Sequence, residues 1–198
     1  MSRRVVELHS IMPIENITSI FQHGILSHDN AEKIPHRSVA LQEIQDRRDK
    51  TVPNGLRLHQ YANLYFNARN PMMYRRKDII GDLCVIRLNL SVLQQPGAVI
   101  SDMNAASDYV SFLQHPMGMG QIDFDYVFAD WWDDEDAITG FRKKAVKCAE
   151  VLIPQSVPTG CITGFYTFDQ QTMQTVTKVL SGLKWQVPVT LNPYLFFK

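Results

Sequence analysis

The sequence predicts one α+β domain that spans residues 1–198, with several short strands and four or five helices. The chain of 198 residues is long enough for one sizeable hydrophobic core and short for two. Segments with helical spacing and segments with strand-like alternation are mixed along it. We find no internal repeat, low-complexity tract or linker that would divide the chain.

The composition is that of an ordinary globular protein, with 45% apolar and 20% charged residues. No apolar run approaches the roughly 18 residues of a membrane span. The N-terminal MSRRVVELHSIMP has no long apolar core and no small-residue cleavage site, so a signal peptide is not expected. Three cysteines without CxxC spacing predict reduced thiols, no structural metal and a cytoplasmic location.

The first third of the chain predicts a strand at 5–10 and then a helix from Pro13 to Gly24, because isoleucines recur there at helical spacing. A turn is expected at 25–30. Ser38 is expected to cap a second helix that ends near Arg48, before a Pro-Asn-Gly turn.

Strands are expected where apolar or aromatic residues alternate with polar ones or form short β-branched runs. Helices are expected at 137–146, where acidic residues precede the first turn and lysines occupy the last, and at 170–180. The segment HPMGMGQ (115–121) is expected to be a loop. The predicted strands are 62–68, 83–90, 98–102, 150–153, 161–168 and 185–190.

Glu150 stands in KCAEVLIP, at the head of an apolar strand, where a lone carboxylate is costly unless it is paired or used. It is either a surface residue on an edge strand, a partner of Lys147, or a functional acid. A functional carboxylate here would stabilise an oxocarbenium ion at a ribose or take a proton from a nucleophile.

Arg47 and Arg48 are placed to bind a pyrophosphate or a DNA phosphate through the planar guanidinium fork, or to lie solvated at a helix end. The sequence does not choose between the two arginines. The net charge is zero, which argues against tight non-specific binding to duplex DNA and allows a short single strand to bind at one local patch. Two basic clusters are candidates for it, each of which would otherwise be a solvated face: Arg69, Arg75, Arg76 and Lys77, and Arg142, Lys143, Lys144 and Lys147.

Tyr65 or Phe66 could supply an aromatic wall for a nicotinamide or adenine ring. The spacing of these two residues also fits the core side of a strand. His9 and His59 are each expected to be structural unless a ligand is present. The GxG in HPMGMGQ is not a Rossmann fingerprint, and Walker, GxSxG and HExxH motifs are absent from the sequence.

The chain resembles the DarT family of DNA ADP-ribosyltransferase toxins over most of its length. The matching segments are ENITSIFQHGILSH, IPHRSVALQEIQDRRDKTVPNG, LHQYANLYFNARNPMMY, ISDMNAASDY and KCAEVLIP. The resemblance implies an ADP-ribosyltransferase-like fold, with two small curved β-sheets around an NAD cleft and flanking helices. It implies transfer of ADP-ribose from NAD to thymine or guanine in single-stranded DNA, without a metal. It also implies a toxin, with a role in phage defence or growth control, paired with a DarG-like macrodomain antitoxin. Nothing in the sequence demands more than a monomer.

Carried over by position, the resemblance makes Glu150 the catalytic glutamate and either Arg48 or Arg47 the second catalytic residue. It places the DNA base near the loop at 129–139. The first strand, LHSIMPIEN, departs from the family pattern by one position at His9. The residues expected to bind NAD are His9, Gly24, Ile25, Arg48, Tyr65 and Phe66, and those expected to bind DNA are Arg75, Arg76, Lys143 and Lys144. The alternatives are an ADP-ribosyltransferase that acts on RNA or protein, and a non-catalytic NAD- or nucleic-acid-binding module.

Overall fold

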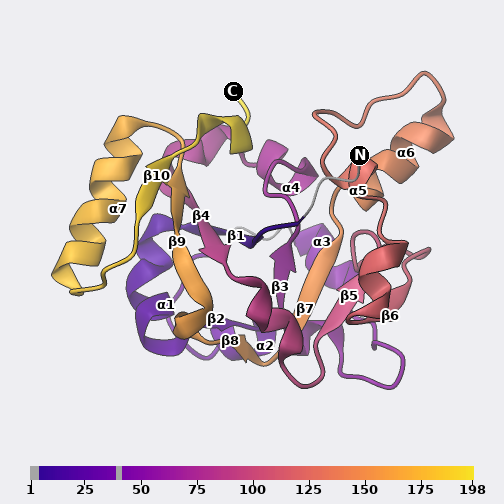
Figure 1. Cartoon of the computed structure of the whole chain (residues 1–198), viewed down its shortest axis with the longest axis horizontal. Coiled ribbons are helices and arrows are strands. Elements are labelled where there is room, and N and C mark those ends of the chain that lie inside the picture. The colour runs from indigo at the N-terminus through magenta and orange to yellow at the C-terminus, as the bar shows by residue number, and fades with distance from the viewer. Residues whose placement is uncertain (1–4, 39–41) are drawn as a thin grey trace.

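The structure is a computed structural model that describes residues 5–38 and 42–198. Its centre is an eight-stranded sheet in the order β10-β9-β4-β1-β3-β7-β5-β6 (Figure 1). The α+β prediction is confirmed. The strands of this sheet are β1 (Leu8–Pro13), β3 (Tyr61–Tyr65), β4 (Leu83–Leu88), β5 (Val99–Ser101), β6 (Phe112–Gln114), β7 (Glu150–Pro154), β9 (Ile162–Thr167) and β10 (Val189–Leu191).

The sheet consists of two four-stranded halves that meet at one residue pair. β1 pairs with β4 along its whole length, and β3 pairs with β7 along its whole length, but β1 and β3 pair only at His9 and Tyr65. Beyond that pair, residues 10–13 of β1 and 61–64 of β3 separate. The halves correspond to the two small sheets that the resemblance implied, and their separation opens a space between β1 and β3.

A separate two-stranded sheet, β2 (Ile25–Leu26) with β8 (Ser156–Val157), lies beside this opening. Gly24 makes the approach to β2 possible: its φ is +76°, and a Cβ there would lie 2.2 Å from the carbonyl oxygen of Val157. Only glycine tolerates both the backbone conformation and the contact.

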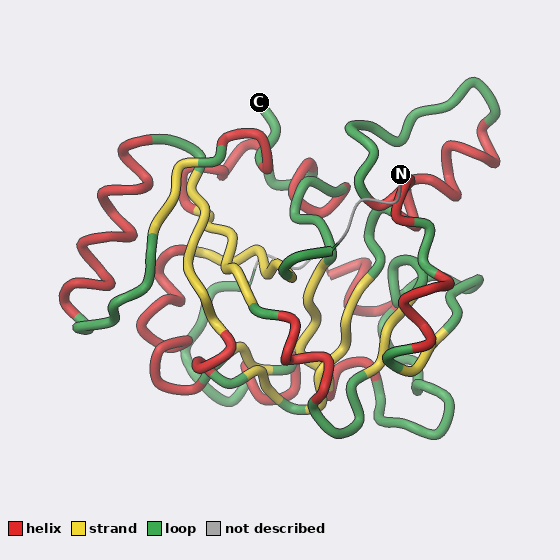
Figure 2. The backbone as a smooth tube through the Cα atoms, viewed as in Figure 1, coloured by secondary structure: helices red, strands yellow, loops and turns green. Residues whose placement is uncertain are grey.

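Helices cover the outside of the sheet (Figure 2). α7 packs on the β9–β10 end, and α5 and α6 lie beyond β7 at the other end (Figure 1). The helices are α1 (Ile17–His23), α2 (His28–Ala31), α3 (Gln42–Arg47), α4 (Pro71–Tyr74), α5 (Phe124–Val127), α6 (Ala137–Val146) and α7 (Gln170–Gly182). Short 3-10 segments lie at Ile14–Asn16, Leu58–Gln60, Lys77–Asp82, Leu90–Gln94, Met117–Gln121, Thr159–Cys161 and Pro193–Leu195.

The core supports the strand predictions, since Leu8, Ile86, Val151 and Phe165 are fully buried in one apolar cluster. The helix at 137–146 is confirmed to the residue, with Asp136 as its N-cap. In the described part of the chain, no helix is long and apolar enough to cross a membrane.

Several element predictions were wrong. The first strand starts at Leu8 and continues to Pro13, because pairing with β4 outweighs the helix-starting preference of proline. The expected turn at 25–30 contains β2 and α2, and the expected loop at 115–121 contains a 3-10 segment. The last strand is shorter than predicted. The helix expected from Ser38 appears as α3, and residues 39–41 lie outside the described ranges.

Candidate active site

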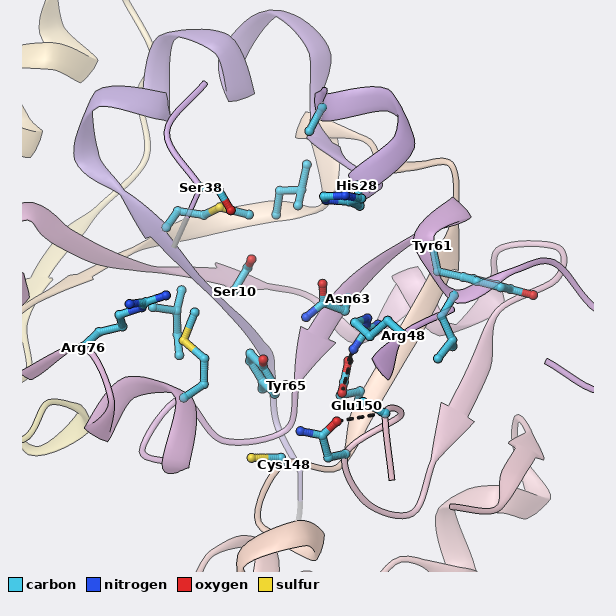
Figure 3. Close-up of a pocket in the computed structure, with 18 of the residues that line it drawn as sticks. Ser10, His28, Ser38, Arg48, Tyr61, Asn63, Tyr65, Arg76, Cys148 and Glu150 are labelled. Atoms are coloured by element: carbon cyan, nitrogen blue, oxygen red, sulfur yellow. Dashed lines mark hydrogen bonds and ion pairs between the residues drawn. The ribbon is translucent and has the colours of Figure 1, made fainter. Parts of the chain in front are cut away.

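A cavity of about 500 Å³ lies where β1 and β3 separate. Ile11 of β1 and Asn63 of β3, which would pair if the strands continued together, both line it instead. Ser10, Asn63, Arg48, Glu150 and Tyr65 converge on it from β1, β3, β7 and the chain after α3 (Figure 3). A volume of this size fits a small-molecule or nucleotide substrate.

Glu150 is the first residue of β7 and is 1% exposed. Its register partners are Tyr65 on β3 and Ser101 on β5, so β7 is an interior strand and the edge-strand alternative is wrong. The backbone amide of Ala105 donates a hydrogen bond to Oε1 at 3.0 Å, and the amide of Glu150 itself donates to Ser101 Oγ at 3.2 Å. These contacts fix the carboxylate against the floor of the cavity.

Lys147 is not the partner of Glu150. Its buried ammonium donates hydrogen bonds to the carbonyl oxygens of Val127 and Ala129, which join α6 to the chain after α5. The partner is Arg48, whose Nη1 lies 3.1 Å from Oε2 and 3.3 Å from Oε1 of Glu150. Arg47, its neighbour, is exposed at the cavity rim. The geometry therefore distinguishes the two arginines that the sequence left open.

The Arg48–Glu150 pair is expensive for stability. Both side chains are removed from water, and a buried ion pair often contributes less than an apolar replacement of equal volume. Nη2 of Arg48 is also buried, with no hydrogen-bond partner among the described residues. An unsatisfied buried donor costs about 1–3 kcal/mol. Such a donor beside a cavity suits an oxygen of a bound substrate.

Lys50 supports the same carboxylate from a distance. Its ammonium donates to the carbonyl oxygens of Ala106 and Ser107 and pairs with Asp108 at 2.6 Å. This holds the loop whose Ala105 amide binds Glu150. One short segment after α3 therefore positions Glu150 both directly and through the loop.

The walls of the cavity near Glu150 are poorly hydrated. Burial, reinforced by the negative charge of Glu150, raises the pKa of Tyr65 well above its ordinary value. Burial, again with Glu150, raises the pKa of the Cys148 thiol to about 12. Both groups are therefore protonated at neutral pH.

The residues expected to bind NAD fall into two groups. Gly24, Ile25, Arg48 and Tyr65 line the cavity. His9 and Phe66 do not. The ring of His9 is held at the junction of the half-sheets by Glu7 and the amide of Ala68, and the ring of Phe66 is buried edge-on against Phe124 in the main core.

The residues expected to bind DNA also divide. Arg75, Arg76 and Lys144 line the cavity, whereas Lys143 points to Asp134, with which it pairs at 2.5 Å. From the region at 129–139 no residue lines the cavity. Phe141, Lys144 and Ala145, later in α6, and Cys148, just beyond it, do.

Several residues of the cavity were not identified from the sequence. Ser10, the neighbour of His9 on β1, lines the cavity, whereas His9 does not. Asn16 exchanges two hydrogen bonds with the backbone of Arg37, at 2.8 and 3.0 Å, and so ties the segment before residue 39 to α1. Other cavity-lining residues that the sequence did not single out are His28, Asn63 and Phe141.

The described residues contain no group of three or more His, Cys, Asp or Glu side chains that could hold a metal ion. A carboxylate fixed by an arginine, in a cavity between two diverging half-sheets, is an arrangement suited to stabilising a developing positive charge on a substrate. The fold and site thus define a transferase-type nucleotide site, and comparison with known proteins identifies the family.

The model of the family described as "ssDNA thymidine ADP-ribosyltransferase, DarT" matches residues 9–197. The chain therefore belongs to the DarT family, which is a family of ADP-ribosyltransferases.

Two relatives illustrate the likeness. A DNA ADP-ribosyl transferase–DNA ADP-ribosyl glycohydrolase fusion protein of Thermosipho africanus is 29% identical over 209 residues, covering all of this chain and 51% of the relative. This chain thus spans about half the length of that fusion protein. A DNA ADP-ribosyl transferase of Thermus sp. strain 2.9 is 26% identical over 185 residues, which are 87% of this chain and 86% of the relative.

Solved structures show the same fold. Thermosipho africanus DarTG in complex with ADP-ribose is 28% identical, with a TM-score of 0.84 over 97% of this chain and 51% of that one. Thermus sp. 2.9 DarT in complex with ADP-ribosylated ssDNA is 22% identical, with a TM-score of 0.87 over the whole of both chains. The same Thermus protein in complex with NAD+ gives a TM-score of 0.83 over the whole of both chains at 19% identity. The ADP-ribosyltransferase-like fold predicted from the resemblance is confirmed.

Proposed function

We propose that this chain transfers ADP-ribose from NAD to a thymine base in single-stranded DNA. The observation that carries the proposal is the buried Arg48–Glu150 pair on the floor of the cavity. The family description and the substrates named for the Thermus relative support the choice of donor and acceptor.

The cavity has features that suit NAD. The unpartnered Nη2 of Arg48 would donate to a phosphate or ribose oxygen. The backbone at Gly24 and Ile25 lines one side, where an approaching dinucleotide meets no side chain on Gly24. The Tyr65 ring offers an aromatic wall next to Glu150, against which the nicotinamide end would lie.

The reaction breaks the bond between the ribose C1′ and the nicotinamide nitrogen, and nicotinamide leaves with the electron pair. A new bond forms between C1′ and a ring nitrogen of the base, which loses its proton. Glu150 would stabilise the positive charge that develops on the ribose and accept that proton before releasing it to solvent. Arg48 would hold the carboxylate in place and orient the donor or the base.

The depth of the site favours a single-stranded acceptor. Glu150 is 1% exposed, so a base must leave its stack to reach it. That costs a few kcal/mol in a duplex and much less in a single strand.

The proposal also covers partners and location. The Thermosipho relative joins a transferase to a DNA ADP-ribosyl glycohydrolase in one chain, which supports a toxin paired with a DarG-like macrodomain antitoxin that reverses the modification. A monomer and a cytoplasmic location complete the proposal. The free thiols Cys84, Cys148 and Cys161 fit a reducing compartment.

The test combines NAD with single-stranded oligonucleotides that each lack one base, and reads product mass. We expect one ADP-ribose per modified strand, with loss of product only when thymine is absent. Glu150→Gln should lower the rate by about 10²–10⁴-fold and Arg48→Lys by about 10²–10³-fold. Arg47→Lys, the exposed neighbour, should lower it far less.

If product is lost only when guanine is absent, the acceptor base is guanine and the ADP-ribosyltransferase activity still holds. Labelling of RNA or protein in place of DNA would overturn the DNA proposal. Bound NAD with no transfer to any acceptor would indicate a binding module.

A further inference from the structure

Helix α6 presents an apolar and cationic face to the cavity that the reaction at Glu150 does not use. Phe141, Lys144 and Ala145 lie on α6 at helical spacing and line the cavity, and Cys148, just beyond the helix, lines it too. Phe141 is nonetheless 60% exposed, and Ile138, one turn earlier on the same side, is 81% exposed. A lone exposed apolar residue needs no explanation, but an exposed phenyl ring on the wall of an active-site cavity does.

This face is fixed in position relative to Glu150. The amide of Asn104 donates to the carbonyl oxygen of Ala145 at 2.9 Å, which ties α6 to the loop that binds the carboxylate. Cys148, two residues beyond the end of α6, and Met72 of α4 line the same cavity. α4 and α6 lie at the same end of the molecule, beside the start of β7 (Figure 1).

Positive side chains lie on one side of Phe141 and negative side chains on the other. Lys144 and, from the end of α4, Arg75 line the same cavity, and Arg75 also lies 3.6 Å from the exposed Glu43. The start of α6 is acidic: Asp134 is taken by Lys143, and Asp136 caps the helix. An anionic chain on this face would therefore run from Phe141 toward Lys144 and α4, away from the acidic end.

We propose that Phe141 and Lys144 form a subsite for the acceptor nucleotide next to the modified one. Its base would stack on the Phe141 ring, and its phosphate would meet the Lys144 ammonium. A ring beside a cation, on a wall continuous with the reactive carboxylate, is the combination that binds unstacked nucleotides. The inference rests on the proposed function, and it makes an oligonucleotide a better acceptor than a single nucleotide.

The aromatic part is tested by direct binding of a thymine-containing single-stranded 8-mer to the Glu150→Gln protein, which needs no turnover. Adding Phe141→Leu should weaken Kd roughly tenfold or more, since stacking on an aromatic residue is worth about 1–3 kcal/mol per base. Adding Phe141→Trp should restore it, because the ring and not its apolar volume carries the effect. NAD binding should change less than twofold in either variant.

The contact of Lys144 with phosphate is tested by comparing Lys144 with its neighbour Lys143. Lys144→Gln should reduce the slope of log Kd against log salt concentration by about 0.7. Lys143→Gln, which breaks only the pair with Asp134, should reduce the slope much less.

Unchanged oligonucleotide affinity in Phe141→Leu would overturn the subsite while leaving the proposed function intact if wild-type protein still labels DNA. Failure of wild-type protein to label DNA would overturn the proposed function separately, because the binding measurement does not depend on it. If Phe141→Leu lost binding to a macrodomain partner and kept its affinity for the 8-mer, the α6 face would be a protein interface, and the subsite would be overturned.

Discussion

Replacing Glu7 by Gln should destabilise the fold, because the carboxylate binds side chains of β1, β4 and β9 in one half-sheet and, through His9, the chain after β3 in the other. Its Oε1 accepts hydrogen bonds from Tyr166 Oη at 2.9 Å and from His9 Nε2 at 3.2 Å, and its Oε2 accepts from Arg87 Nε at 2.9 Å. His9 Nδ1 accepts from the amide of Ala68 at 3.2 Å, so Nε2 carries the ring proton. The network links β1, β4 and β9 to the chain after β3.

The magnitude follows from the pKa of Glu7. Burial alone would raise that pKa, but the hydrogen bonds from His9, Arg87 and Tyr166 outweigh it and lower the pKa from 4.5 to about 2. That depression corresponds to about 3 kcal/mol of folding free energy at pH 7. The side chain is 15% exposed, and solvent screening reduces the expected value to about 2 kcal/mol.

The sign of the pH dependence is fixed, since a carboxylate with a depressed folded-state pKa stabilises the fold above its unfolded pKa. The contribution of Glu7 is complete above about pH 5 and is lost as pH falls from 4.5 toward 2. Urea unfolding of wild type and Glu7→Gln should show a gap of about 2 kcal/mol at pH 7, reduced by roughly a third to a half at pH 3.5.

The control is Glu15→Gln, because Glu15 is more than half exposed and lies 3.8 Å from Arg37. Its effect should stay within about 0.5 kcal/mol. A gap for Glu7→Gln that is equally large at pH 7 and pH 3.5 would refute the electrostatic reasoning and assign the effect to packing. No gap at pH 7 would refute the network as a source of stability.

Three further changes test other parts of the molecule. Gly24→Ala should lower melting temperature and NAD affinity together, measured by thermal scans and calorimetry, since its Cβ would lie 2.2 Å from the Val157 carbonyl at φ +76°; an unchanged NAD Kd would contradict this. Lys147→Met should cost about 1–3 kcal/mol in urea unfolding, because two carbonyl oxygens lose their buried donor; full stability would show that water replaces it. In native protein at pH 8, iodoacetamide should modify the half-buried Cys161 before Cys148, whose pKa is about 12, as peptide mass spectrometry will show; the reverse order would contradict the buried position of Cys148.

Local pattern was sufficient for elements whose partners are close in sequence. The acidic start and basic end of α6 fixed its limits, and the apolar run after Glu150 identified an interior strand. Pattern was not sufficient for β2 and β8, each two residues long, because their pairing depends on contacts between segments about 130 residues apart. The resemblance, and not the pattern, supplied the two-sheet architecture and the expectation that Gly24 and Ile25 bind NAD; both line the cavity.

Two choices between neighbouring residues depend on the same physical cause. Arg47 and Arg48 are adjacent at the end of a helix, and tertiary packing alone decides which one turns inward. His9 and Ser10 are adjacent on β1, and a shift of one residue decides which one reaches the cavity. Sequence identifies the segment that carries a functional group, whereas the choice between neighbours depends on contacts with distant parts of the chain.

The single pairing of β1 with β3 at His9 and Tyr65 explains why the cavity exists. Had β1 and β3 paired beyond His9 and Tyr65, backbone hydrogen bonds would fill the space that Ile11 and Asn63 now border. The network around Glu7 compensates on the β1 side by fastening the junction with charged hydrogen bonds. Stability concentrated at the joint therefore offsets the cost of the buried Arg48–Glu150 ion pair nearby. Weakening the joint through Glu7 should impair transfer more than an equally destabilising change in α7, which packs at the far end of the sheet.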